Sequence, residues 1–206
     1  GGAAALAGVI VLGAREGRFS KSGETKSLVP FAASSIPLVT LGTFLLWFGW
    51  FGFNGFSQLA MGTFDDVNAI SKIAVNTHLA GAAGTVAAAV VTRLLGGKTD
   101  IVMMLNGALA GLVAITAEPL TPSPVLAIVI GAIGSLIMYF GTKFLESKKI
   151  DDVVGAIPVH MFAGIFGTLV VPLSNSGTNF GTQLTGVIAV CVFSFVLSYI
   201  TFKVLK

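Results

Sequence analysis

His160 is the residue of this 206-residue sequence most suited to chemistry. It lies near the middle of an apolar run, 156–171, in which no other side chain can carry a charge. An ionisable group in such a run costs free energy unless it lines a cavity or has a partner, and it therefore points to a functional site. Because an imidazole gains and loses a proton near neutral pH, His160 could relay protons. From the residues alone, a relay role and a packing role are equally open.

Other apolar runs carry further polar side chains: Asn76, Thr77, His78, Asn106 and Thr116. Together with His160 they could line a common path, in which Asn76 and Thr116 would be pore-lining residues. The alternative is that they hold helices together, because buried Asn and Thr often form hydrogen bonds between helices. We favour this alternative for the two asparagines and Thr77, and a packing role for His78. A distant rival, with no other support in the sequence, is a membrane redox subunit in which His78 and His160 bind haem.

An aromatic cluster with interspersed glycines lies at the end of the apolar run 36–53. Trp50 and Phe53 are three residues apart and would share one face of a helix, with Gly49 and Gly52 leaving room for a neighbour. Such a face at a pore entrance could attract a cation through the electrons of the rings, or close the pore by its bulk. Aromatic residues near a helix end also form interfacial belts, so geometry alone does not choose between these roles.

The composition identifies the class of protein. Hydrophobic residues make up 54% of the chain, charged residues 10%, and the mean hydropathy is +0.92, whereas about a quarter of the residues of a soluble domain are charged. The chain is therefore an integral membrane protein. Its net charge of +3 is too small and too scattered to predict a nucleic-acid partner. The single Cys191 excludes an internal disulfide, and no Cys/His cluster has the spacing of a metal site, so neither a metal nor a cofactor is expected.

Apolar runs of about 20 residues, the length that spans a bilayer as a helix, predict an all-α polytopic fold. Their Gly and Ala residues would let the helices approach closely, as in a packed bundle. The opening run, within 1–14, is too short to span, and we expect it to be the second half of a helix that starts upstream. The six full-length segments are 36–53, 68–92, 101–117, 125–144, 154–173 and 184–204.

The loops that join these segments alternate in charge. Three of them, 54–67, 118–124 and 174–182, contain no Lys or Arg. Under the positive-inside rule the basic stretches lie in the cytoplasm, and the C-terminus is then cytoplasmic. Lys72 is the exception, and it lies near the outer end of its segment, where its side chain can reach the membrane surface. The basic stretches carry Arg15, Arg18, Lys21, Lys26, Arg93, Lys98, Lys143, Lys148, Lys149, Lys203 and Lys206.

Four stretches of the sequence carry a family resemblance. They read LGTFLLWFGWFGFN, VNTHLAGAAG, LNGALAGLVAIT and IDDVVGAIPVHMFAGIFGTL. In order and spacing they resemble the Amt/Mep/Rh family of ammonium transporters, over the whole of residues 1–206. The resemblance implies an eleven-helix fold whose first ten helices form two inverted five-helix repeats. This chain would be its C-terminal part, from the end of the fifth helix to the eleventh, in a homotrimer of the cell membrane.

The resemblance also implies roles for individual residues. His160 corresponds to the second of two pore histidines that relay the proton of ammonium, and the first would lie just upstream of Gly1. Phe53 corresponds to one of two stacked phenylalanines that gate the outer pore, Ser57 to the serine of the ammonium-recruitment site, and Trp50 to a pore-lining tryptophan. The implied function is that of a transporter and not an enzyme: ammonium loses its proton in an apolar pore, and ammonia and the proton pass inward. The alternative is an ammonium sensor with a C-terminal signalling domain.

The chain departs from the family pattern just before the histidine. Asp151 and Asp152 are present, but Gly155 stands where the family has a further aspartate. The missing carboxylate could change helix packing at the inner mouth of the pore. In relatives, a cytoplasmic tail follows the position of Lys206, and it helps to bind a PII-type regulatory protein or leads into a signalling module.

Overall fold

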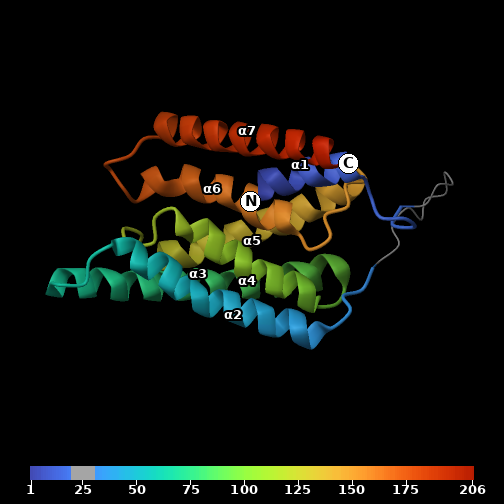
Figure 1. Cartoon of the computed structure of the whole chain (residues 1–206). Helices are drawn as coiled ribbons and strands as arrows, with labels where there is room; N and C mark the ends of the chain where they lie inside the picture. Colours follow the sequence, from blue (N-terminus) through green and yellow to red (C-terminus); the bar gives the residue numbers. More distant parts are fainter. Residues whose placement is uncertain (20–30) are drawn as a thin grey trace.

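The computed structural model of the protein describes residues 1–19 and 31–206, so Lys21 and Lys26 of the first basic stretch lie outside the described residues. The elements of the described part are helices, and most of them run along one common direction (Figure 1). In chain order they are α1 (Gly2–Leu12), α2 (Ile36–Gly55), η1 (Phe56–Gln58), α3 (Phe64–Gly96), α4 (Ile101–Thr116), α5 (Pro124–Ser147), η2 (Ile157–Phe162), α6 (Ala163–Val170), η3 (Val171–Leu173) and α7 (Phe180–Leu205).

Several of these helices have the length and composition of membrane spans, which confirms the all-helical, polytopic class. Within residues 1–19 and 31–206, four helical stretches are long and apolar enough to cross a bilayer: α2 with η1, α3, α5 and α7. Two further segments expected to span are shorter apolar helices, α4 with 16 residues and Ile157–Leu173. The latter begins three residues later than the expected segment 154–173, because Gly155 takes a φ of +79°, which interrupts the helix.

The helix starts follow from local side chains that cap them. In each case a short polar side chain accepts a hydrogen bond from a backbone N–H of the first turn, which satisfies a donor that has no partner within the helix. At α3 the capping is reciprocal, because Asp66 also accepts from the backbone N–H of Thr63, and this helix starts four residues before the expected segment. The five capping residues are Ser35, Thr63, Asp100, Ser123 and Asn179.

Helices α3, α4 and α5 form the most closely packed part of the bundle. A side chain at Gly84 of α3 would overlap the carbonyl oxygen of Gly107 of α4, and one at Gly131 of α5 would overlap the backbone of Ala80. These glycines let the backbones come into contact, which is how transmembrane helices gain packing energy without a hydrophobic driving force between them. This packing fixes how α3, α4 and α5 lie against one another, and with it the positions of the polar residues that they carry.

The remaining helices flank this centre. Helix α2 packs on α3 and α4, while α1 lies beside α7 and η2 on the other side of the bundle (Figure 1). Helix α7 has no buried residue, and α2 has only Thr43, Asn54 and Gly55. Both helices therefore present broad apolar faces to their surroundings.

Candidate functional site

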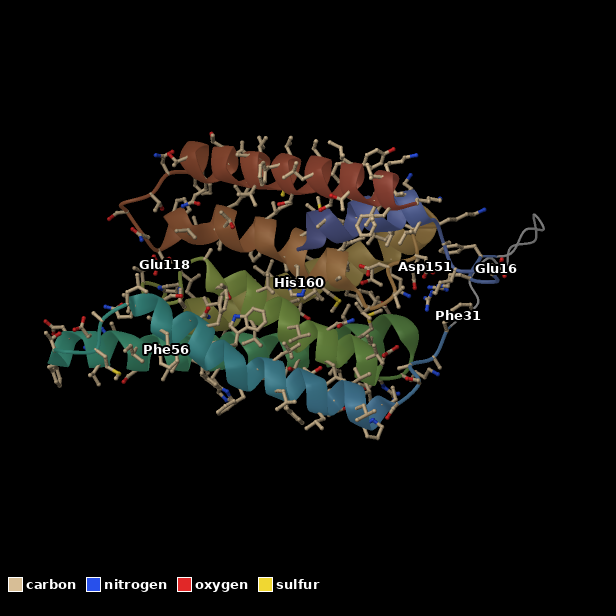
Figure 2. The ribbon with its side chains drawn as sticks, viewed as in Figure 1. Glu16, Phe31, Phe56, Glu118, Asp151 and His160 are labelled. Carbon is tan, nitrogen blue, oxygen red and sulfur yellow. The ribbon has the colours of Figure 1, made fainter. Side chains whose placement is uncertain are left out.

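A polar pocket lies at the end of the bundle that carries Glu118, opposite the end that carries Asp151 (Figure 2). Its volume is about 310 Å³. It is lined by the end of α2, by η1, by Ile73 of α3, and by the C-terminal end of α4 with its following loop. Among the lining residues are Phe53, Ser57, Thr116 and Glu118.

Trp50 contacts two lining residues of this pocket, and a hydrogen bond between helices fixes its ring. Its Nε1 donates to Oγ1 of Thr116 over 2.7 Å, and the Thr116 hydroxyl in turn donates to the carbonyl oxygen of Leu112 over 2.6 Å. The rings of Trp50 and Phe53 contact each other with centroids 6.0 Å apart. Two residues expected to line the pore, Trp50 and Thr116, are thus brought together with Phe53, the expected outer gate.

Ser57 lies one helical turn beyond Phe53, and its hydroxyl oxygen can still accept a hydrogen bond. Its hydroxyl donates to the carbonyl oxygen of Phe53 over 2.7 Å, so the lone pairs of Oγ remain available to an N–H donor. The side chains of Ser57 and Phe53 are exposed, the latter by 65%. A small cation with N–H groups could meet both an oxygen acceptor and an aromatic ring here.

Asn76 lies apart from this group, and its side chain stabilises a loop. It is buried, and its Nδ2 donates to the carbonyl oxygens of Pro119 and Pro122, each over 2.9 Å. Its neighbour Thr77 accepts a 3.0 Å hydrogen bond from Asn54 of α2. These contacts favour the packing role over the pore-lining role for both residues.

His160 lies in a widened helical turn. Helix η2 is a π-helix in which the backbone N–H of Ala163 donates to the carbonyl oxygen of Pro158, five residues earlier. Pro158 has no N–H and its ring disfavours a regular α-helix around it, which accounts for the local widening. Such π turns are often found at functional sites, because they turn a side chain away from the regular helical position.

The imidazole of His160 lines a cavity of about 420 Å³ between α1, α6 and α7. Its side chain is exposed, and it makes no hydrogen bond to any other residue in the described part of the chain. Thr168, Cys191 and Ser194 line the same cavity, and sequence reasoning did not single them out as site residues. This cavity shares no lining residue with the pocket at Phe53, so the two candidate regions are separate within the described residues.

His78 does not lie with His160. Its ring is exposed on α3 and contacts two aromatic rings of α2, Trp47 at 5.6 Å and Phe51 at 6.2 Å between centroids. The packing role expected for His78 agrees with these contacts.

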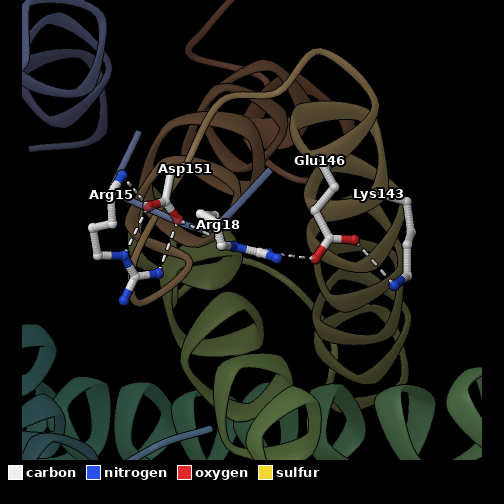
Figure 3. Close-up of polar contacts among 5 residues, drawn as sticks. All are labelled: Arg15, Arg18, Lys143, Glu146 and Asp151. Carbon is white, nitrogen blue, oxygen red and sulfur yellow. Dashed lines mark hydrogen bonds and ion pairs between the residues drawn. The ribbon is translucent and has the colours of Figure 1, made fainter. Parts of the chain in front are cut away.

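A network of ion pairs lies at the opposite end of the bundle (Figure 3). Asp151, whose side chain is only 2% exposed, pairs with Arg15 at 2.7 Å and with Arg18 at 3.3 Å. Arg18 also pairs with Glu146 of α5, which in turn contacts Lys143. The hydrogen bonds from Arg15 lower the pKa of Asp151 to about 2, and the same contact raises the pKa of Arg15.

Asp152 and Asn106 organise the residues before His160. The two carboxylate oxygens of Asp152 accept from the backbone N–H groups of Ala156 and Ile157 over 3.0 and 2.7 Å, so Asp152 caps the start of η2. Asn106 of α4 donates to the carbonyl oxygen of Val154 over 3.2 Å. Gly155 lies against this amide with its positive φ, a conformation that disfavours an aspartate. The backbone at this position therefore suits the glycine that stands in place of the family aspartate.

Glu118 is the pocket residue that sequence reasoning missed. It directly follows the segment that carries Thr116, in a loop with no Lys or Arg. The sequence did contain an indication of this role. Glu118 is an acidic residue at the end of an apolar run, two positions from the candidate pore residue Thr116.

Packed apolar helices with a polar pocket at one end and an accessible histidine in the bundle are the features of a membrane transport protein. The chain belongs to the Ammonium Transporter Family, which residues 1–206 match throughout. The family resemblance of the four sequence stretches is thereby confirmed, and the family consists of transporters, not enzymes.

Individual relatives support the same assignment. The chain is 43% identical over 178 residues to ammonium transporter Amt2 of Archaeoglobus fulgidus, covering 86% of this chain and 36% of the relative. It is 37% identical over 214 residues to ammonium transporter Amt1 of Haloferax mediterranei, covering 98% and 41%.

Solved structures have the same fold. A Sensor Amt Protein matches with a TM-score of 0.88 and 35% identity, covering 100% of this chain and 52% of that protein. Mep2 of Candida albicans matches with a TM-score of 0.84 and 29% identity, covering 97% and 46%. The chain thus spans about a third to a half of the length of these relatives.

Proposed function

We propose that this chain forms part of an ammonium transporter that takes up ammonium at the pocket of Phe53 and Ser57 and removes its proton in an apolar pore. His160 accepts or relays this proton. The observation that carries the proposal is the imidazole of His160, which reaches a cavity from a π turn within an apolar helix, in a chain of the Ammonium Transporter Family.

The proposed direction follows from the distribution of charge. Arg15, Arg18 and Lys143 lie at the end with Asp151, whereas the loop with Glu118 has no basic residue. Under the positive-inside rule the end with Asp151 is cytoplasmic, as is the C-terminus, and the pocket of Ser57 faces outward.

The chemistry of the cargo explains why a histidine would be needed. A charged ammonium ion is costly to move through an apolar pore, whereas neutral ammonia is a small polar molecule that can pass. Deprotonation therefore lowers the barrier, and a cation that cannot release a proton is excluded. A histidine suits this step because an imidazole gains and loses a proton near neutral pH and its proton affinity is easily shifted by its surroundings.

The remaining elements of the proposal come from the family. A second histidine, beyond the residues of this chain, would share the proton with His160. Phe53 would gate the outer end of the pore, and Trp50 and Thr116 would line it. The protein would act as a homotrimer, with a PII-type regulatory protein as a possible partner.

A second candidate function is favoured by the match to the Sensor Amt Protein, with its TM-score of 0.88. In this alternative, binding of ammonium in the same fold is passed to a signalling domain. The two functions differ in flux, because a sensor needs to bind ammonium but not to conduct it.

The replacement His160→Ala in the full-length protein tests the proposal. Ammonium-dependent current or methylammonium uptake should be lost, while the oligomeric state in detergent stays the same. His78→Ala is the matched control, because His78 contacts only aromatic rings on α2, and its flux should be retained. Undiminished electrogenic flux in His160→Ala would refute the relay role, and saturable ammonium binding without flux in the unaltered protein would favour the sensor.

A further inference from the structure

We infer that Glu118 is a specificity-determining residue of the recruitment pocket, where its carboxylate attracts and helps to coordinate the ammonium cation. The inference rests on the proposed function of the pocket at Ser57 and Phe53. It adds a formal negative charge to a pocket whose other lining side chains are uncharged.

The position of Glu118 is fixed by three hydrogen bonds. Oε1 accepts from the backbone N–H groups of Leu120 and Thr121, each over 3.2 Å, and Oε2 accepts from Nδ2 of Asn175 over 2.8 Å. The carboxylate thereby connects the loop after α4 to the loop before α7. A second contact between these loops, from Oγ1 of Thr121 to Oγ of Ser174 over 3.1 Å, holds them in the same relation.

The carboxylate of Glu118 can accept one further hydrogen bond. A carboxylate has about four acceptor positions, and the hydrogen bonds above occupy three of them. The fourth belongs to Oε2, the oxygen bound to Asn175. Ser57 and Glu118 line the same pocket of about 310 Å³, and an ammonium ion has four N–H donors to distribute among such acceptors.

Glu118 forms no ion pair with the lysines and arginines that the structure describes. The ion pairs in the ranges 1–19 and 31–206 lie at the other end of the bundle. A negative group in a partly enclosed pocket raises the local concentration of cations, whereas a neutral amide of the same shape does not. The side chain is only partly buried, so this effect should weaken with added salt.

The replacement Glu118→Gln in the full-length protein removes the charge and keeps the shape. We expect the ammonium concentration for half-maximal uptake to rise by roughly 3- to 10-fold, with maximal uptake changed by less than about twofold. The difference from the unaltered protein should shrink at high ionic strength. The half-saturating concentration is measured both by uptake and by equilibrium binding of radiolabelled methylammonium. If the protein binds methylammonium without transporting it, the binding measurement still tests the role of Glu118.

Two control variants separate charge from architecture. Asn175→Ala removes one of the two contacts between the loops but retains the carboxylate, and its half-saturating concentration should stay within about twofold of the unaltered value. Asp65→Asn removes an exposed charge from the first turn of α3, outside the pocket, and should have no effect. An equal loss in Asn175→Ala and Glu118→Gln would overturn the inference, because Glu118 would then act only by holding the loops.

A further variant, Ser57→Leu, separates failure of the role of Glu118 from failure of the proposed function. Ser57→Leu should weaken capture at low ammonium concentration if the pocket recruits the cation. A clear effect of Ser57→Leu with no effect of Glu118→Gln would overturn the role of Glu118 alone. No effect of either variant on half-saturation would overturn the outer site itself, and with it the role of Glu118.

Discussion

Nε1 of Trp50 donates a 2.7 Å hydrogen bond to Oγ1 of Thr116, which joins α2 to α4 at the pocket. The two residues are 66 positions apart in the chain. Since the hydroxyl also donates to the carbonyl oxygen of Leu112, Thr116 both accepts the hydrogen bond from the indole N–H and is itself held in one orientation. The indole ring, and through it the contact with Phe53, is therefore positioned by a residue of another helix.

Thr116→Val should disturb this arrangement. Valine has nearly the same shape but leaves the indole N–H without its acceptor, at a cost of about 1 to 2 kcal/mol in the free energy of unfolding. Uptake should fall as well, because the ring of Trp50 loses its fixed orientation. Thr116→Ser restores the hydroxyl and should recover most of both properties. Thermal unfolding in detergent and methylammonium uptake are the two measurements, and equal values for the Val and Ser variants would contradict the expectation.

Asp151 should make stability depend on pH in the acid range. Its pKa is lowered from 3.8 to about 2 by Arg15, so the stabilisation is present above about pH 4 and is lost as the pH falls towards 2. With allowance for the solvent that screens the 40% exposed Arg15, the contribution at neutral pH is about 1 kcal/mol. Asp151→Asn should lower the melting temperature at pH 7 and flatten its fall between pH 4 and pH 2. An unchanged acid profile in this variant would show that Asp151 is not responsible.

Gly84→Ala should destabilise the centre of the bundle. The added Cβ would overlap the carbonyl oxygen of Gly107, and the backbones of α3 and α4 would have to separate. Overpacking of this kind costs about 1 to 3 kcal/mol. Gly42→Ala is the matched control, because a Cβ at Gly42 meets no atom within 4 Å and alanine favours a helix. The melting temperature of Gly84→Ala should be lower than that of the unaltered protein, and the melting temperature of Gly42→Ala should be higher.

Gly155→Asp, which restores the family carboxylate, should be unfavourable in this chain. The φ of +79° strains any residue with a Cβ, and the new side chain would also meet the amide of Asn106. We expect a loss of about 1 to 3 kcal/mol in the free energy of unfolding. Gly155→Asn should cost less, since asparagine tolerates left-handed backbone better than most residues. A variant Gly155→Asp as stable as the unaltered protein would mean that the loop adopts another conformation without cost.

Much of the fold was predictable from the sequence because its determinants are local. Runs of apolar residues predict the helices, and the capping residues Ser35, Thr63 and Asn179 explain where they start. The position of His160 within an apolar run singled it out, and the motif around it led to the family. The bounds of the helix around His160 were less predictable, because they depend on the backbone of Gly155 and Pro158.

The candidate site was predictable only in part. Trp50 and Phe53 lie on one helix, so their spacing indicates a shared face. The pairing of Trp50 with Thr116 depends on how far α2 is shifted along α4, and no local pattern contains that shift. Asn76 illustrates the same limit, since its residue type fits a pore as well as a packing contact. Only its hydrogen bonds to the loop carbonyls of Pro119 and Pro122 favour the packing role.

The sequence by itself determined the class of protein, the apolar segments and the isolated histidine, because hydropathy and helix capping act over a few residues. Only the tertiary structure decided that Arg15 holds Asp151 across 136 positions, and that Glu118 and Asn175 join two loops beside Ser57. These contacts depend on the packing of whole helices, in which α3 and α4 approach closely at Gly84. The approach fixes the relative height and rotation of whole helices, and these are properties of the packed bundle and not of any one segment.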